Sequence, residues 1–235
     1  MIRIRPHWCL VIAMFCPAVL GLAGGADAAL INSYPSQITV TTSSALSGLF
    51  AGSQLVDGSG FGGSAPNFTD ADSDGLPEHG NGVTGMHWLS LKADVAGQWV
   101  AFDLGQSWQL DTMRIWNYNQ GSWQLRSVQS AKLYYSTAVD PDETDPSGWT
   151  QLVGPNTGGA FTLAQATGAA DYDAVIDLAF GGATARHVLI DVQTNYGSDS
   201  DGVGLSEVQF YNVPEPATLS LLALPAIALI RRRRR

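Results

Sequence analysis

Short runs of β-branched and aromatic residues, separated by Gly, Asn, Asp and Pro, occupy most of the chain between residues 29 and 212. In the run at 99–104, the apolar residues Val100, Phe102 and Leu104 alternate with other positions and therefore share one face of an extended strand. Almost no apolar periodicity of 3.6 residues, which marks an amphipathic helix, appears in this region. The pattern predicts an all-β fold for residues 29–212, a β-sandwich.

Six runs are the clearest predicted strands. They are residues 99–104, 112–118, 131–136, 174–180, 187–194 and 206–211. In the last run Val208 and Phe210 share a face, and we expect this face to meet the face that carries Phe102 across the core. Between residues 55 and 81 the composition changes to Gly, Ser and Asp with few large apolar residues, which predicts one long loop or a pair of loops.

Residues 1–28 have the composition of a secretory signal peptide. Arg3 and Arg5 make a basic start, an apolar stretch follows at 8–22, and an Ala-Asp-Ala cleavage motif ends at Ala28. Removal of this segment also removes both cysteines of the sequence, so disulfides cannot stabilise the mature chain. We therefore predict an exported protein.

Residues 213–235 have a three-part pattern. Pro214, Glu215 and Pro216 precede an apolar run at 217–230, and arginines end the chain. At about 1.5 Å per helical residue this run reaches ~21 Å, which is less than the ~30 Å hydrocarbon core of a bilayer. The terminal arginines favour the cytoplasmic side of the membrane, which leaves the preceding chain outside.

This tail resembles the PEP-CTERM sorting signal of Gram-negative bacteria. The resemblance implies that a membrane-embedded exosortase recognises Pro214, Glu215 and Pro216 and removes the tail, so that the chain associates with the inner membrane only transiently. It also implies delivery to the cell surface or the extracellular matrix. A plain C-terminal membrane anchor is the alternative, although such anchors are usually longer.

The chain is acidic, with 21 Asp and Glu against 12 Lys and Arg and a formal net charge of −9. Most of its arginines lie in the two end segments, so the mature region is more acidic still. Such a surface repels nucleic acid, which we exclude as a partner, and favours divalent cations. His79 and His87 lie in the flexible region without a zinc-binding helix, and no nucleophile signature appears, so we predict no enzyme.

The sharpest local motif is the acidic segment from Asp70 to Glu78. Asp70, Asp72 and Asp74 stand at alternate positions before a glycine, so a tight turn can direct several oxygens at one hard cation. Asn81 occupies the position where an EF-hand loop has glutamate, and Glu78 fills a later ligand position instead. We predict a calcium site at Asp70, Asp72, Asp74 and Glu78. A solvated acidic loop that keeps the protein soluble is the alternative.

A second resemblance rests on an ordered set of short motifs. They are Val56-Asp57-Gly58, Trp88-Leu89-Ser90, residues 99–105, Tyr135-Ser136-Thr137, Trp149, residues 185–190 and Leu205-Ser206-Glu207-Val208. In this order they resemble the discoidin, or coagulation factor type C, domain of the galactose-binding-like superfamily. The resemblance covers nearly the whole mature domain and implies a jelly-roll sandwich. The loop between Asp57 and Trp88 is longer than is usual in that family.

The discoidin resemblance also implies a structural calcium ion. In that family the ion lies under the Asp-Gly loop and is reached by a glutamate near the C-terminus, and Asp57 and Glu207 match these positions. The alternative for Glu207 is an exposed strand position, because it alternates with apolar Val208. A single site shared with the acidic segment around Asp70 is a further alternative.

The mature region is also rich in tryptophan. Sugars stack their C–H faces on aromatic rings and bond their hydroxyls to Asn, Asp or Arg, so a sugar site needs an exposed aromatic residue beside planar polar groups. One stretch offers this mixture and is our predicted carbohydrate site: Trp116, Asn117, Tyr118, Asn119, Trp123 and Arg126. We expect Trp88, Trp99 and Trp149 to lie in the core.

These features together predict an exported, calcium-stabilised, non-catalytic binding protein whose partner is a polysaccharide. The alternative is a structural matrix or biofilm protein that is cross-linked through calcium and has no defined sugar pocket.

Overall fold

The computed structural model describes residues 28–33, 36–62, 70–82, 84–91 and 94–214, which belong to one compact unit. The predicted signal peptide up to residue 27 and the predicted sorting signal from Glu215 onward lie outside the described residues. In the described part of the chain, no helix combines the length and the apolar composition needed to cross a membrane.

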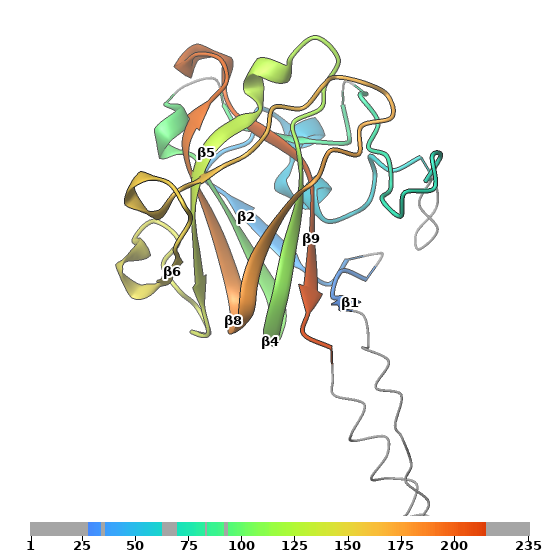
Figure 1. Ribbon diagram of the computed structural model, residues 1–235. Helices are drawn as coiled ribbons and strands as arrows, with labels where there is room; N and C mark the ends of the chain where they lie inside the picture. The colour runs from blue at the N-terminus through green and yellow to red at the C-terminus, as the bar shows by residue number, and fades with distance from the viewer. Residues whose placement is uncertain (1–27, 34–35, 63–69, 83, 92–93, 215–235) are drawn as a thin grey trace, which may run out of the picture. The chain divides into compact units, whose positions relative to one another are not determined.

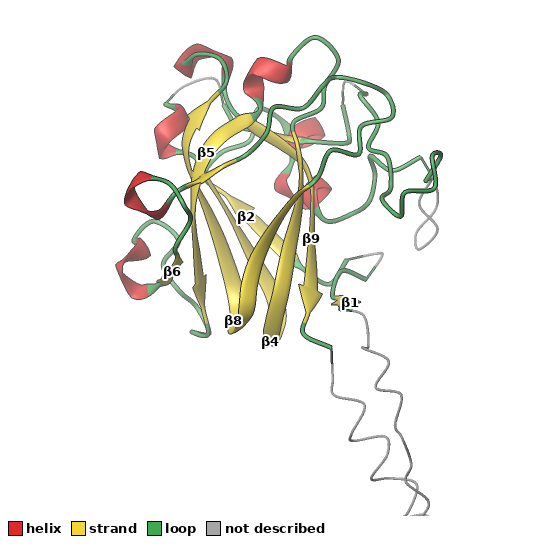
Figure 2. Ribbon diagram, in the orientation of Figure 1, coloured by secondary structure: helices red, strands yellow, loops and turns green. Residues whose placement is uncertain are grey.

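Within the described residues the chain forms nine β-strands and several short 3₁₀ helices (Figure 2). The strands are β1 (Ala29–Leu30), β2 (Thr39–Thr42), β3 (Trp88–Leu89), β4 (Trp99–Asn117), β5 (Val128–Ser136), β6 (Thr150–Leu152), β7 (Phe161–Thr162), β8 (Ile176–Asn195) and β9 (Gly204–Asn212). The 3₁₀ helices are η1 (Gly48–Phe50), η2 (Gly52–Leu55), η3 (Val95–Gly97), η4 (Gln124–Arg126), η5 (Pro146–Gly148), η6 (Thr157–Gly159) and η7 (Asp199–Asp201). The prediction of an all-β sandwich is confirmed, although β4 and β8 each unite two of the predicted runs.

The two long strands build both layers of the sandwich. β4 and β8 pair antiparallel along most of their length, with an irregularity between Asp103 and Trp108. Gly105 lies in this irregular stretch with a positive φ of 79°, a conformation that glycine adopts without steric cost. The first half of β4 pairs with β2 and its second half pairs with β9. One layer therefore contains β2, β5 and β6, the other contains β1, β3 and β9, and β4 and β8 pass from one layer to the other.

The apolar faces of the two layers meet in the core. Phe102 on β4 and Phe210 on β9 are fully buried and pack edge to face, with ring centroids 5.2 Å apart. This contact confirms the predicted meeting of the two strand faces, and burial of each phenylalanine contributes about 1.5–3 kcal/mol. Trp88 and Trp149 are buried as predicted, whereas Trp99 is partly exposed.

Because β4 bends in its middle, it begins and ends at the same end of the sandwich. This end, the loop end, is formed by residues 70–82, 118–127 and 164–173 (Figure 1). Asn119 joins these segments, since its Nδ2 lies 3.1 Å from His79 O and 2.8 Å from Ala169 O. The opposite end, the bend end, contains the turns of β4 and β8 at residues 105–107 and 181–182.

Candidate functional site

The acidic segment of the loop end gathers its carboxylates at one point. Ligand oxygens of Asp70, Asp72 and Glu78 all lie within 4.8 Å of one another. Backbone donors hold the turn: the Asp74 N–H donates to Asp70 Oδ1 and Asp72 Oδ1, each at 3.2 Å, and the Gly75 N–H donates to Asp70 Oδ2 at 3.0 Å. The backbone therefore arranges these three side chains so that their oxygens can converge on a single hard cation.

Glu78 is the buried member of this cluster, with 7% of its surface exposed. Its Oε1 accepts hydrogen bonds from the Ala71 N–H and, at 3.3 Å, from the Asp72 N–H. No described residue donates a hydrogen bond to its Oε2. A buried polar atom without a partner costs about 1–3 kcal/mol, and a cation held by the cluster would satisfy this oxygen.

Asp74, the fourth predicted ligand of this segment, belongs to a neighbouring group. Ligand oxygens of Asp72, Asp74 and Asp173 also lie within 4.8 Å of one another. In the sequence Asp173 belongs to an ordinary acidic turn, and only the fold brings it to the acidic segment. No local signal in the sequence distinguishes it.

The second predicted calcium site contains a buried glutamate. Glu207 on β9 is fully buried, so the alternative of an exposed strand position is wrong. Its Oε1 accepts a hydrogen bond from the Gly58 N–H at 3.3 Å, which places it beside the Asp-Gly loop. Asp57 Oδ1 accepts from the Ser59 N–H at 2.9 Å. Among the described residues, neither carboxylate belongs to a group of three acidic or histidine side chains with converging ligand atoms.

Four of the six predicted sugar-binding residues are inaccessible. Trp116, Asn117, Tyr118 and Asn119 have no exposed surface, so they cannot stack on or bond a sugar at the surface. Packing is the reason for this correction. The Trp116 ring packs edge to face on Phe61 with centroids 5.0 Å apart, and other core residues enclose the rest of the segment.

The two buried asparagines hold the loops instead. Asn117 Nδ2 donates to Val128 O at 2.8 Å and to Ala164 O at 2.7 Å. Asn119 Oδ1 accepts from the Gly168 N–H at 2.8 Å, in addition to the bonds made by its Nδ2. Buried amides that use both their donors and their acceptors fix the backbone around them. These side chains therefore position the loop end rather than contact a ligand.

His79 and His87 also belong to this buried framework. Both are fully buried, and their ring centroids lie 5.3 Å apart. Burial lowers the pKa of His79 to about 3, helped by the neighbouring His87, and burial lowers the pKa of His87 to about 4. A Cβ on Gly60 would lie 1.8 Å from His79 Nε2, so only glycine fits there. Both histidines are therefore packed side chains of the loop end.

Trp123 and Arg126 are the two predicted sugar-binding residues that form a surface feature. Trp123 is 49% exposed, whereas Arg126 is only 6% exposed. The Arg126 Cζ lies 4.1 Å from the centroid of the Trp123 ring, so the guanidinium stacks on the indole. Arg126 Nη1 donates to Gln120 Oε1 at 3.4 Å, which anchors the guanidinium beneath the ring. Leu125, which sequence reasoning did not single out, is also exposed and lies beside them in η4.

No protein-family model and no curated protein matches the sequence. One similar solved structure is chitosan-binding module 2 of a chitosanase/glucanase from Paenibacillus sp. IK-5, in complex with chitotriose. It is 17% identical to this chain, the match covers 74% of this chain and 95% of that module, and the TM-score is 0.47. The module CpGH89CBM32-5 from Clostridium perfringens, in complex with GalNAc-β-1,3-galactose, is 12% identical, with coverage of 74% and 94% and a TM-score of 0.48. Both of these solved structures are carbohydrate-binding modules, and the likeness concerns the fold alone.

Proposed function

We propose that the protein is an exported, non-catalytic carbohydrate-binding protein that presents Trp123 to a polysaccharide. The observation that carries this proposal is the half-exposed indole of Trp123, supported from beneath by the buried guanidinium of Arg126. A fixed aromatic ring loses little conformational freedom when a ligand stacks on it, so more of the contact energy remains as affinity. Sugars offer the flat C–H faces that suit such a ring.

The neighbourhood of Trp123 supplies the rest of a shallow sugar platform. Leu125 is 54% exposed and extends the apolar surface. Gln124 Nε2 donates to Thr167 O at 3.3 Å, which ties η4 to the adjacent loop. The platform therefore stands on a braced segment at the loop end, where aromatic stacking contributes most of the binding.

Calcium is the proposed cofactor, held by Asp70, Asp72 and Glu78. Three converging carboxylates, one of them buried with an oxygen that lacks a donor among the described residues, match the all-oxygen ligand sets of this ion. Bound calcium would neutralise the repulsion among the carboxylates and hold the acidic segment against the loop end. Asp57 and Glu207 are the second, discoidin-like candidate site.

We further propose that the C-terminal signal delivers the protein to the cell surface or the extracellular matrix. Pro214, Glu215 and Pro216 with the apolar and basic tail support this proposal. An exosortase would be the processing partner, with transient association of the tail with the inner membrane.

Affinity electrophoresis tests the binding function. The purified protein is run through gels that contain soluble neutral polysaccharides, with calcium or with a chelator. We expect retardation by at least one glycan, and loss of that retardation in Trp123→Ala. Val153→Ala, which removes another exposed apolar side chain, is the matched control and should migrate as wild type. Equal retardation of the wild type and Trp123→Ala would refute Trp123 as the platform.

A second experiment separates the structural alternative. In the group of Asp72, Asp74 and Asp173 the first two carboxylates are exposed, which favours a matrix protein cross-linked through calcium, because open carboxylates from two molecules can share one ion. That function predicts self-association that rises with calcium and needs no glycan, which light scattering measures directly.

A further inference from the structure

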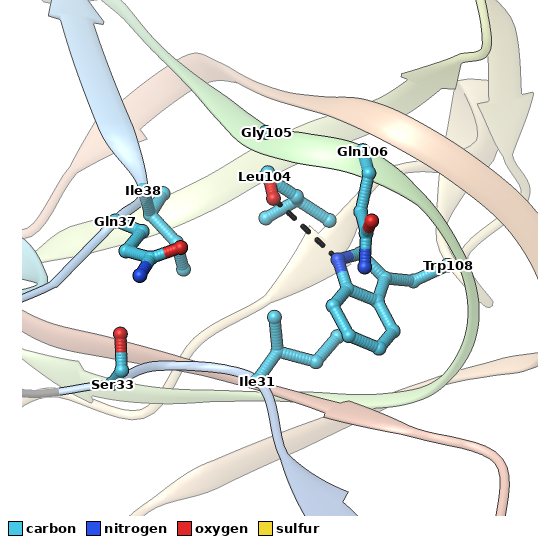
Figure 3. Close-up of a pocket in the computed structure, with 8 residues that line it drawn as sticks. All are labelled: Ile31, Ser33, Gln37, Ile38, Leu104, Gly105, Gln106 and Trp108. Carbon is cyan, nitrogen blue, oxygen red and sulfur yellow. Dashed lines mark hydrogen bonds between the residues drawn. The ribbon is translucent and has the colours of Figure 1, made fainter.

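A second concave site lies at the bend end of the sandwich (Figure 3). A pocket of ≈ 220 Å³ opens there between the turn of β4 and the segment that follows β1. Its lining includes Trp108, Gln106 and Leu104 from β4, together with Gln37, Ser33 and Ile31. The pocket lies at the bend in the middle of β4, whereas Trp123 follows the C-terminal end of that strand at the loop end, so the pocket and the Trp123 platform lie at opposite ends of the sandwich.

An aromatic ring in a fixed orientation forms one wall of the pocket. Trp108 Nε1 donates to Leu104 O at 3.4 Å, so the polar edge of the indole is engaged by the backbone. The side chain is partly buried and packs against the main core. The carbon surface of the ring and the Leu104 side chain therefore present an apolar wall to the pocket.

Neutral polar groups complete the lining. Figure 3 shows Gln37 on one side of the opening and Gln106 beside Trp108 on the other. Both glutamines are exposed, and the single hydrogen bond among the eight residues drawn joins Trp108 to Leu104. The two amides are thus not tied to the other residues of the pocket. Each offers two donors and one acceptor oxygen to a ligand.

The charge of the pocket limits the class of ligand. None of the eight described lining residues is acidic or basic, so these residues offer no counter-charge to an ion. An apolar wall beside amide and hydroxyl groups instead matches a neutral molecule with one C–H face and several hydroxyls. The volume is below the ~300–1,000 Å³ of pockets for drug-sized ligands, which suits a single sugar ring.

We propose that this pocket is a second carbohydrate site, which binds one neutral sugar unit through Trp108, Gln37 and Gln106. The inference shares the ligand class of the proposed function but uses a different surface. With sites at opposite ends, one molecule can hold two polysaccharide chains, and binding of both sites to a matrix raises the apparent affinity. The protein would then cross-link polysaccharide through its own two sites.

Saturation-transfer NMR of the full chain tests the second site. Galactose, glucose and N-acetylglucosamine are the probes, and Trp123→Ala removes the first platform so that the pocket is observed alone. We expect at least one probe to bind Trp123→Ala, and its signal to fall at least five-fold when Gln37→Ala and Gln106→Ala are added. These two positions are exposed, so the added changes should leave the melting temperature unchanged. Trp108→Ala is a secondary variant because it also removes core packing.

The outcomes separate this inference from the proposed function. If the wild type binds a probe and Trp123→Ala binds none, the pocket is not a sugar site and the first platform stands. If Trp123→Ala binds and the glutamine changes have no effect, the pocket assignment is likewise overturned. If no probe binds the wild type, the second site is refuted, while retardation in the polysaccharide gels decides the first independently.

Discussion

Trp116 and Trp123 belong to the same short segment of the chain, yet the structure uses them in opposite ways. Trp116 is the penultimate residue of β4, where it lies opposite Glu207 on β9 and has no exposed surface. Trp123 precedes η4, and 49% of its surface is exposed. The Trp116 ring is packed in the interior beneath the loops, whereas the Trp123 ring lies at the surface, stacked on the buried Arg126.

The difference shows that the residues at the end of β4 form the buried framework of the loop end, whereas the residues that follow β4 form the Trp123 platform. At the end of β4 the side chains of Asn117 and Asn119 bond to the neighbouring loops, and the Asn119 amide bonds to two of them, at His79 and at residues 168–169. Beyond Gln120 the chain turns outward, so that Trp123 and Leu125 are exposed while Arg126 stays buried against the Trp123 ring. A change before the turn should therefore alter stability, and a change after it should alter binding.

The largest expected effect is that of Trp116→Ala. Removal of a buried tryptophan leaves a cavity and should lower the free energy of unfolding by about 3–5 kcal/mol. Trp123→Ala is the matched control and should lower it by no more than about 0.5 kcal/mol, because the ring is half exposed. Urea unfolding followed by far-UV circular dichroism measures both. Similar losses for the two variants would contradict the division between framework and platform.

Acid should weaken the framework through His79 and His87. Their folded pKa values, about 3 and about 4, lie below the ~6.5 of an unfolded histidine. Below pH 6.5 the unfolded chain therefore binds more protons, so the stability present at neutral pH is lost as the pH falls. At pH 5 the loss is about 2 kcal/mol for each histidine. Urea unfolding at pH 7, 6 and 5 measures this slope.

His87→Gln provides the control for this pH dependence. Gln can still donate to Gly82 O, which the His87 Nε2 contacts at 2.9 Å, but it does not titrate. The variant should lose about half of the slope between pH 7 and pH 5. An unchanged slope would assign the acid sensitivity to other groups.

The sequence predicts the layers better than the site, and the reason is physical. Alternating apolar residues mark the face of a strand that is buried, so the burial of Phe102 and of Phe210 follows from the local pattern. Burial of Trp116 and the approach of Asp173 to Asp72 depend on loops that are distant in the sequence. The joining of separate predicted runs into β4 also escapes local pattern, because a bent strand and two strands linked by a turn have similar sequences.

Removal of calcium should have a smaller effect on the stability of the fold, exerted through the acidic segment. If Asp70, Asp72 and Glu78 bind the ion, calcium at one hundred times its Kd should stabilise the fold by about 2.7 kcal/mol. Glu78→Gln should abolish most of this gain, whereas Asp140→Asn, at an exposed position outside the cluster, should retain it. Thermal melts with calcium and with chelator measure the difference. If calcium raised the melting temperature of Glu78→Gln as much as that of the wild type, the calcium site would be assigned to Asp57 and Glu207 instead.

The smallest expected effect is that of Arg126→Lys. This variant tests whether sugar binding by Trp123 requires the stacked guanidinium of Arg126. The variant keeps the charge but replaces a planar guanidinium stacked on Trp123 by a compact ammonium, which covers less of the ring. Loss of stacking should release the indole and weaken polysaccharide binding about three- to ten-fold, corresponding to about 0.7–1.4 kcal/mol. Arg186→Lys, whose guanidinium pairs with Asp103 near the bend end, is the matched control. Isothermal titration should show weaker binding for Arg126→Lys alone; equal affinities would mean that Trp123 binds without a fixed orientation, as an isolated exposed ring.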